Sequence, residues 1–152
     1  MKAVIQRVIE SSVSVDGRVV GKSEKGYMIL LGVVKGDTDK EAQLLASKTA
    51  NLRVFEDENG KMNKSIIDID GDALVISQFT LCADCKKGNR PSFTNSEEPE
   101  NAKRLYELFC QELKACGVKN VETGIFAADM KVSLINDGPV TICFDTDIWR
   151  KN

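Results

Sequence analysis

Apolar and polar positions along this chain follow strand-like spacing in most segments and helix-like spacing in two. Residues 26–33 form an unbroken apolar run, which predicts a strand buried on both faces near the centre of a sheet. Asp16-Gly17 lies between two strand-like segments and predicts a hairpin turn. Strands are expected over residues 2–8, 12–16, 18–22, 26–33, 73–81, 121–126, 130–135 and 140–144.

The two helical segments have start and stop signals. Thr38 followed by Glu41 is a capping box and predicts a helix to about Leu52. Ser96 is the predicted cap of a second helix, which is expected to stop at Gly117. The inward-facing positions should be Ala42, Leu45, Ala46 and Thr49 in the first helix and Leu105, Leu108, Phe109 and Leu113 in the second.

Strands that outnumber helices within one uninterrupted unit predict an α/β fold. The 152 residues fit one compact domain with its own core, and no repeat or linker divides them. We therefore expect a single domain over residues 1–152, with strand-rich sheets and both helices packed on one side.

Charge and hydropathy exclude several classes of protein. Charged residues make up 29% of the chain, but the net charge of −2 gives no overall attraction to phosphate, so any contact with nucleic acid would be local. There is no secretory signal pattern and no apolar run long enough to span a bilayer. We expect a soluble cytoplasmic protein that does not contact a membrane.

The cysteines do not indicate a metal centre. Cys82, Cys85, Cys110, Cys116 and Cys143 are an odd number scattered through apparent core and loop, as expected of reduced thiols. A zinc site on the closely spaced first pair would need two more soft ligands, and the chain contains no histidine. Neither a metal nor another cofactor is expected.

The absence of histidine also restricts the chemistry, because the side chain that most often serves as a general base is missing. Ser77, Gln78 and Thr80 lie at the predicted end of an apolar strand, where they would face the mouth of a pocket or else bond to neighbouring backbone. A hydroxyl nucleophile needs an activating partner, and no adjacent residue supplies one.

A Gly-Pro step, Gly138-Pro139, separates the last two predicted strands. Proline cannot donate to a sheet, so this step is expected to present bare carbonyls at a sharp corner that could recognise a ligand. An ordinary hairpin corner is the alternative, and the dipeptide alone does not fix the isomer of its peptide bond.

The loop after residue 82 contains the one basic cluster of note, formed by Lys86, Lys87 and Arg90. These side chains could contact RNA phosphates or could simply be solvated.

Several of these segments occur together in a pattern that resembles, nearly end to end, the D-aminoacyl-tRNA deacylase family. The matching motifs are Ala3-Val4-Ile5-Gln6-Arg7-Val8, Asn51-Leu52-Arg53-Val54-Phe55-Glu56-Asp57, Gly60-Lys61-Met62-Asn63, Ser77-Gln78-Phe79-Thr80-Leu81, Lys87-Gly88-Asn89-Arg90-Pro91-Ser92-Phe93 and Asn136-Asp137-Gly138-Pro139-Val140-Thr141. The chain departs from the family at Ala127, where glycine is usual.

The resemblance implies a homodimer that hydrolyses the ester joining a D-amino acid to the 3′ end of tRNA, and it leaves open activity on glycyl-tRNA. In the family the matching Gly-Pro peptide is cis and reaches into the pocket of the other subunit. Its carbonyls receive the amino group of the substrate, and an L-residue clashes with them. By the same resemblance Arg7 braces this loop, Met130 forms a pocket wall, and Asn136 and Thr141 complete the substrate-binding set.

The resemblance also implies how the ester is cleaved. Backbone N–H groups near Phe79 and Thr80 would stabilise the oxyanion, and the 2′-hydroxyl of the terminal adenosine would assist the attacking water. Ser77 and Gln78 would hold the adenosine. A covalent role for the Thr80 hydroxyl is the competing interpretation.

Three other functions stay open at this stage. A sister deacylase that edits L-alanyl-tRNA has the same fold, but with a trans Gly-Pro and a different signature at residues 77–80. A tRNA-binding module without catalysis would leave the ester intact, and a dimeric scaffold would not bind tRNA at all.

Overall fold

The computed structural model describes residues 1–150, which form eight strands, two long helices and two short 3-10 helices. In chain order these are β1 (Lys2–Val15), β2 (Arg18–Ser23), β3 (Gly26–Gly32), α1 (Asp39–Ala50), β4 (Phe55–Glu56), β5 (Met62–Lys64), β6 (Asp72–Ser77), η1 (Phe79–Cys82), α2 (Pro99–Ala115), β7 (Asn120–Thr123), β8 (Lys131–Asp145) and η2 (Thr146–Trp149).

One strongly curved sheet dominates the molecule. Its order is β2-β1-β3-β6-β7, and β8 pairs along the other edge of the long strand β1. The pairs of β6 with β3 and with β7 are parallel, whereas β1 is antiparallel to all its neighbours. Gly21 of β2 lies against the carbonyl of Thr123 in β7, so the sheet curls until its two ends nearly meet.

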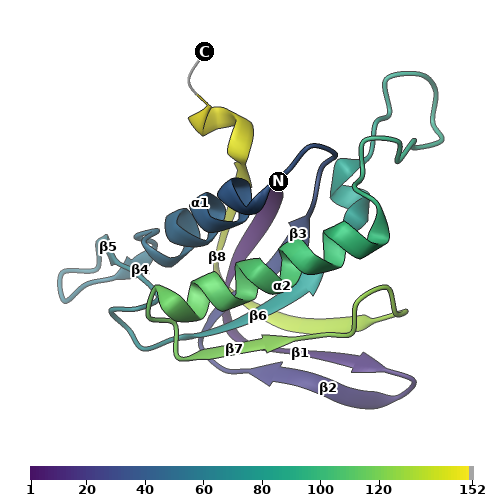
Figure 1. Cartoon of the computed structure of the whole chain (residues 1–152). Helices are drawn as coiled ribbons and strands as arrows, with labels where there is room; N and C mark the ends of the chain where they lie inside the picture. Colours follow the sequence, from purple (N-terminus) through teal and green to yellow (C-terminus); the bar gives the residue numbers. More distant parts are fainter. Residues whose placement is uncertain (151–152) are drawn as a thin grey trace.

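The two long helices lie side by side across one side of the sheet (Figure 1), as the sequence predicts. Between helices and sheet lies the larger apolar core, to which Tyr27, Ile29 and Val75 contribute from the strands and Leu45 and Phe109 from the helices. The curl of the sheet encloses a second, smaller cluster. Its buried members are Val8, Val13, Met28, Leu74 and Ile76.

The helix signals are confirmed at one start and wrong at the other. The Thr38 hydroxyl accepts from the backbone N–H of Lys40, and Glu41 completes the capping box. The second helix begins later than predicted, because its N-cap is Glu98 rather than Ser96. Pro99 occupies the first helical position, where it has no N–H that needs a cap and its φ is already helical.

Two pairs of predicted strands are single strands. Residues 2–8 and 12–16 belong to β1, and residues 130–135 and 140–144 belong to β8. The two long strands pair with each other along almost their whole length, from Lys2 to Ser14 of β1, with two shifts in register. The two predicted strands at 73–81 and 121–126 are shorter than expected, since β6 ends at Ser77 and β7 at Thr123.

The structure bears on two further expectations, the state of the cysteines and the absence of a membrane-spanning helix. All five cysteines are free thiols, as predicted. Within residues 1–150, no helix combines the length and apolar character needed to cross a bilayer.

A buried ion pair ties the two ends of the described chain together. The α-ammonium of Met1 donates to the Asp37 carboxylate at 2.9 Å and to the Thr146 hydroxyl at 2.8 Å. The second oxygen of Asp37 accepts from the N–H of Val34 at 2.7 Å, and its side chain is only 1% exposed. The Met1 ammonium and the Asp37 carboxylate together therefore join the start of β1, the loop before α1 and η2.

Asp37→Asn is expected to lower the free energy of unfolding by about 3 kcal/mol, because it leaves a buried ammonium without its counter-charge. Urea unfolding measures this loss. Asp70→Asn is the matched control, since Asp70 pairs with Lys119 at 3.3 Å on the surface and should change stability far less. Equal midpoints for the two variants would contradict the structural role of Asp37.

Candidate functional site

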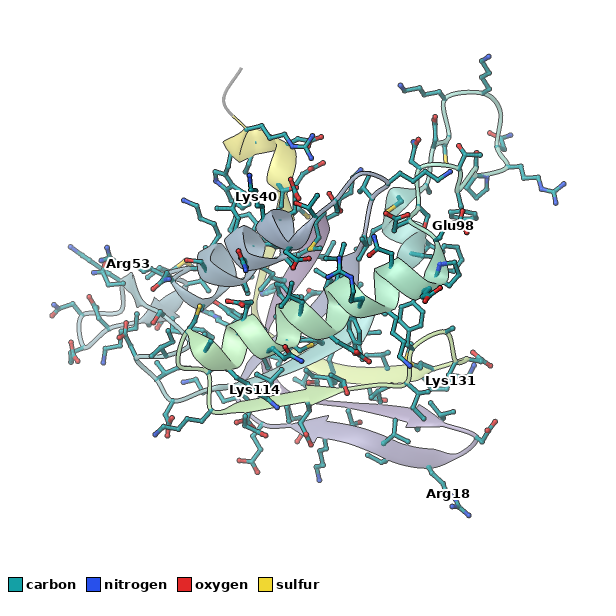
Figure 2. The ribbon with its side chains drawn as sticks, in the orientation of Figure 1. Arg18, Lys40, Arg53, Glu98, Lys114 and Lys131 are labelled. Atoms are coloured by element: carbon teal, nitrogen blue, oxygen red, sulfur yellow. The ribbon has the colours of Figure 1, made fainter. Side chains whose placement is uncertain are left out.

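A cavity of about 570 Å³ opens beyond the carboxyl ends of β3 and β6. Its walls come from the end of β6 and the start of η1, from the first turn of α2, and from the β7–β8 connection. The predicted site residues that line it are Ser77, Gln78, Phe79 and Met130, and the rings of Phe93 and Phe126 are also in its wall. Figure 2 shows Glu98, a lining residue, at the start of α2 on the same side of the molecule as Lys131 at the start of β8.

The backbone changes direction at the cavity. The N–H of Gln78 still bonds to the carbonyl of Leu31 at 2.8 Å, but the chain then enters η1. The predicted strand to Leu81 is therefore wrong, although its β-prone composition favours a strand. Phe79 and Thr80 become the first two residues of a 3-10 helix, and their N–H groups have no acceptor in residues 1–150. Two unpaired donors beside a cavity are suited to bind an oxyanion.

The side chains of this turn are held by neighbours. The Phe79 ring is 56% exposed and meets Phe93 edge-on, with ring centroids 5.2 Å apart. The Thr80 hydroxyl bonds to the side-chain amide of Gln78 and does not line the cavity. An amide N–H cannot take a proton, so the partner of Thr80 does not activate its hydroxyl as a nucleophile.

Three carboxylates border the cavity, those of Glu97, Glu98 and Asp129. The backbone N–H of Glu98 and the side-chain amide of Asn101 donate to Glu97 and hold the pKa of its carboxyl below the usual range. Glu97 is thus ionised at neutral pH but is a weak proton acceptor.

The segment Asn136–Thr141, called here the Gly-Pro segment, lies within β8. Thr141 pairs with Gln6, and Asn136 pairs with Val8. Between these two pairs β8 has three more residues than β1. The hairpin alternative is therefore wrong, because both flanks pair with the same strand, and the segment is an irregularity within it. The Gly138-Pro139 peptide bond is cis, and both residues are exposed.

Arg7 anchors this segment to the rest of the chain through hydrogen bonds. Its side chain is buried, and Nε donates to the carbonyl of Asp137 at 3.0 Å while a terminal nitrogen donates to the carbonyl of Val54 at 2.7 Å. A Cβ built on Gly138, which has φ +126°, would lie 3.1 Å from the Arg7 guanidinium. At the far end of the segment, the Thr141 hydroxyl donates to Gln6 at 2.8 Å. The backbone here is held closely on both sides.

Within one chain the Gly-Pro segment does not lie at the cavity. Asn136 pairs with Val8, which pairs with Gly26 at the start of β3, whereas Ser77 lies opposite Leu31 at the end of β3. Five residues of strand, about 16 Å, separate these two positions. The structure therefore brings Met130 to Ser77, Gln78 and Phe79, and leaves the rest of the predicted substrate-binding set elsewhere.

The basic cluster lies on a loop that projects from the molecule beyond η1 (Figure 1). Asp84 and Ser92 close the loop with two mutual backbone hydrogen bonds of 2.8 and 2.9 Å. Lys86, Lys87 and Arg90 are exposed along it.

The departure at Ala127 also lies in the cavity wall. Its φ is +65°, in the left-handed region that glycine enters freely and alanine rarely adopts. The backbone thus takes this conformation here even with a side chain present.

The chain matches the family model described as D-Tyr-tRNA(Tyr) deacylase over residues 4–145. It belongs to this family. The resemblance seen in the sequence is confirmed, and two relatives named D-aminoacyl-tRNA deacylase illustrate it. The protein from Geotalea uraniireducens (strain Rf4) is 58% identical over 96% of this chain and 94% of its own length. That from Persephonella marina (strain DSM 14350 / EX-H1) is 60% identical over 96% of this chain and 98% of its own length.

Two solved structures have the same architecture. One named c-Myc DNA Unwinding Element Binding Protein superposes with a TM-score of 0.90 at 41% identity, covering 95% of this chain and 98% of that one. One described as a probable eukaryotic D-amino acid tRNA deacylase has a TM-score of 0.81 and covers 94% and 97% of the two chains. Its identity of 15% makes it evidence for the fold alone.

Proposed function

We propose that this protein hydrolyses the ester bond of D-aminoacyl-tRNA, releasing free D-amino acid and tRNA, in the cytoplasm. Family membership over residues 4–145 carries this proposal. The unpaired N–H groups of Phe79, which lines the cavity, and of the next residue, Thr80, fit the chemistry, because ester hydrolysis develops negative charge on the carbonyl oxygen.

We further propose that the active site is shared between two copies of the chain in a homodimer. The Gly-Pro segment of one copy would enter the cavity of the other, where its carbonyls accept from the α-ammonium of a D-residue. An L-residue would place its side chain against the same carbonyls and be rejected. Two observations support this arrangement: Gly138 and Pro139 are exposed, and no residue of the segment lines the cavity of its own chain, since Asn136 lies about 16 Å and Thr141 about 10 Å along the sheet from Ser77.

The attack on the ester would use a group of the substrate. No histidine exists in the chain, and Glu97 is a weak base. The 2′-hydroxyl of the terminal adenosine lies next to the ester and would assist the attacking water. Ser77, Gln78 and the Met130 wall would hold the adenosine, and the N–H groups of η1 would bind the oxyanion.

Thr80→Ala is expected to keep kcat within about tenfold of the wild type, because the hydroxyl positions and does not react. Single-turnover hydrolysis of D-tyrosyl-tRNA measures this directly. A folded Thr80→Ala protein with no residual activity would restore the covalent interpretation.

The exposed cations Lys86, Lys87 and Arg90 would contact phosphates of the acceptor stem. Removing one of them should weaken binding to all tRNAs alike and reduce the slope of log K against log salt by about one. An unchanged slope would mean that these side chains are only solvated.

One comparison of three substrates tests the function itself. The wild-type protein should release tyrosine from D-tyrosyl-tRNA and leave L-tyrosyl-tRNA and L-alanyl-tRNA intact. Hydrolysis of L-alanyl-tRNA would identify the sister activity. Binding of charged tRNA without release of the amino acid would indicate a non-catalytic module.

A further inference from the structure

A second cavity, of about 720 Å³, lies at the end of η1, whereas the first lies at its start. The residues that line it come from parts of the chain far apart in sequence: the N-terminus, the loop before α1, the end of η1 with the basic loop, and η2 with the residues that flank it. Figure 1 shows the N-terminus, η2 and the basic loop at the same end of the molecule. Of its lining residues, only Lys86 has a part in the proposed function, as a contact to tRNA phosphates.

The two cavities share a wall. Val33 lines the first cavity and Val34 the second, and Ser96 and Asn95 are divided in the same way. Neighbouring Cα atoms are about 3.8 Å apart, so only a thin wall separates the cavities at these points. A strand of RNA whose last nucleoside occupies the first cavity would therefore have to cross only this wall to place the preceding nucleotides in the second.

The lining of the second cavity contains equal numbers of carboxylates (Asp37, Asp84, Asp145 and Asp147) and side-chain cations (Lys2, Lys35, Lys86 and Arg150), so a phosphate would depend on a cation that no carboxylate neutralises. Lys2 lies near Asp145, with 3.9 Å between charged atoms, and Arg150 pairs with Asp147 at 3.1 Å. Lys35 also lines the cavity, and no carboxylate of residues 1–150 lies within salt-bridge distance of it. Its ammonium is thus available to an incoming anion.

The cavity also offers an acceptor for a base. One carboxylate oxygen of Asp84 bonds to the backbone N–H of Lys86 at 2.9 Å, and the other oxygen has no partner in residues 1–150. Carboxylates accept from the N4 amino group of cytosine. A carboxylate next to available cations in one cavity matches a cytidine nucleotide, and two cytidines precede the terminal adenosine of every tRNA.

We propose that this second cavity binds the cytidine nucleotides that precede the terminal adenosine, with Lys35 on a phosphate and Asp84 on a cytosine amino group. The inference rests on the proposed function, since the first cavity must hold the adenosine.

Lys35→Glu distinguishes the contribution of the second cavity to substrate binding from that of the first. The variant should raise KM for D-tyrosyl-tRNA about tenfold, because it replaces an attraction to phosphate by a repulsion. KM for D-tyrosyl-adenosine, which has no preceding nucleotide, should not change. Lys22→Glu is the matched control, because Lys22 is an exposed lysine on β2 that lines neither cavity, and it should affect neither substrate.

Competition by short RNAs tests whether the second cavity recognises cytosine. CpCpA should inhibit wild-type hydrolysis of D-tyrosyl-adenosine more strongly than adenosine does, and Asp84→Asn and Lys35→Glu should each reduce that advantage. Equal inhibition by CpCpA and adenosine in the wild type would overturn the inference, as would an equal rise in KM for both substrates in Lys35→Glu. If the proposed function itself is wrong, the wild type will hydrolyse neither substrate.

Discussion

Replacing Gly138 by alanine is expected to lower kcat/KM for D-aminoacyl-tRNA by about 100-fold, the loss typical of a misplacement of about 1 Å in an active site. Gly138 has φ +126°, and an added Cβ would lie 3.0 Å from the Val140 side chain and 3.1 Å from the Arg7 guanidinium. Arg7 cannot yield without losing its bonds to the carbonyls of Asp137 and Val54. The Gly-Pro segment must therefore move, and its carbonyls move with it.

The ratio of kcat/KM for D- and L-tyrosyl-tRNA should fall in the same variant, because the carbonyls that we propose to reject the L-residue are displaced. Gly60→Ala is the matched control. Gly60 also has a positive φ, +74°, but lies in an open turn with no atom within 4 Å of an added Cβ. Both variants strain the backbone, but only the Cβ added at Gly138 crowds neighbouring atoms. Only Gly138→Ala should therefore lose activity and discrimination. Wild-type discrimination by a folded Gly138→Ala protein would show that the Gly-Pro segment does not form part of the active site.

Phe79→Pro is expected to lower kcat by at least about 100-fold, because proline removes an N–H from the proposed oxyanion site. The backbone accepts this change. Residue 79 is the first of η1, a position suited to proline, and the preceding Gln78 has φ −140° and ψ 82°, outside the helical region that proline disfavours before it.

Phe79→Ala is the control for the aromatic ring. It removes the same side chain and keeps the N–H, so the difference in kcat between the two variants reports the hydrogen-bond donor alone. Circular dichroism of the two proteins should agree. Equal kcat values would place the oxyanion donors elsewhere.

Features set by neighbouring residues were predictable from the sequence. The capping box at Thr38 is local, and the apolar run from Gly26 predicts a strand covered on both faces, which β3 is. The site motifs at Ser77 and Gly138 were found through the family pattern. Their composition alone left the ordinary structural interpretations open.

Features set by tertiary pairing could not be predicted. The Gly-Pro step interrupts strand spacing, so β8 looks like two strands until β1 is seen to pair with both parts. Phe79 and Thr80 favour a strand by composition, yet the chain turns into η1 where β3 ends and no partner remains. The second cavity had no signal in the sequence, since residues as distant as Lys2 and Arg150 line it together.

The central claim is that each active site takes its Gly-Pro segment from one subunit and its N–H donors from the other. Co-expressing Gly138→Ala and Phe79→Pro chains and measuring deacylation of D-tyrosyl-tRNA tests it. A heterodimer would carry both substitutions in one site and neither in the other, so random pairing should restore about a quarter of the wild-type sites. Activity that stays as low as that of the separate variants would contradict a shared site.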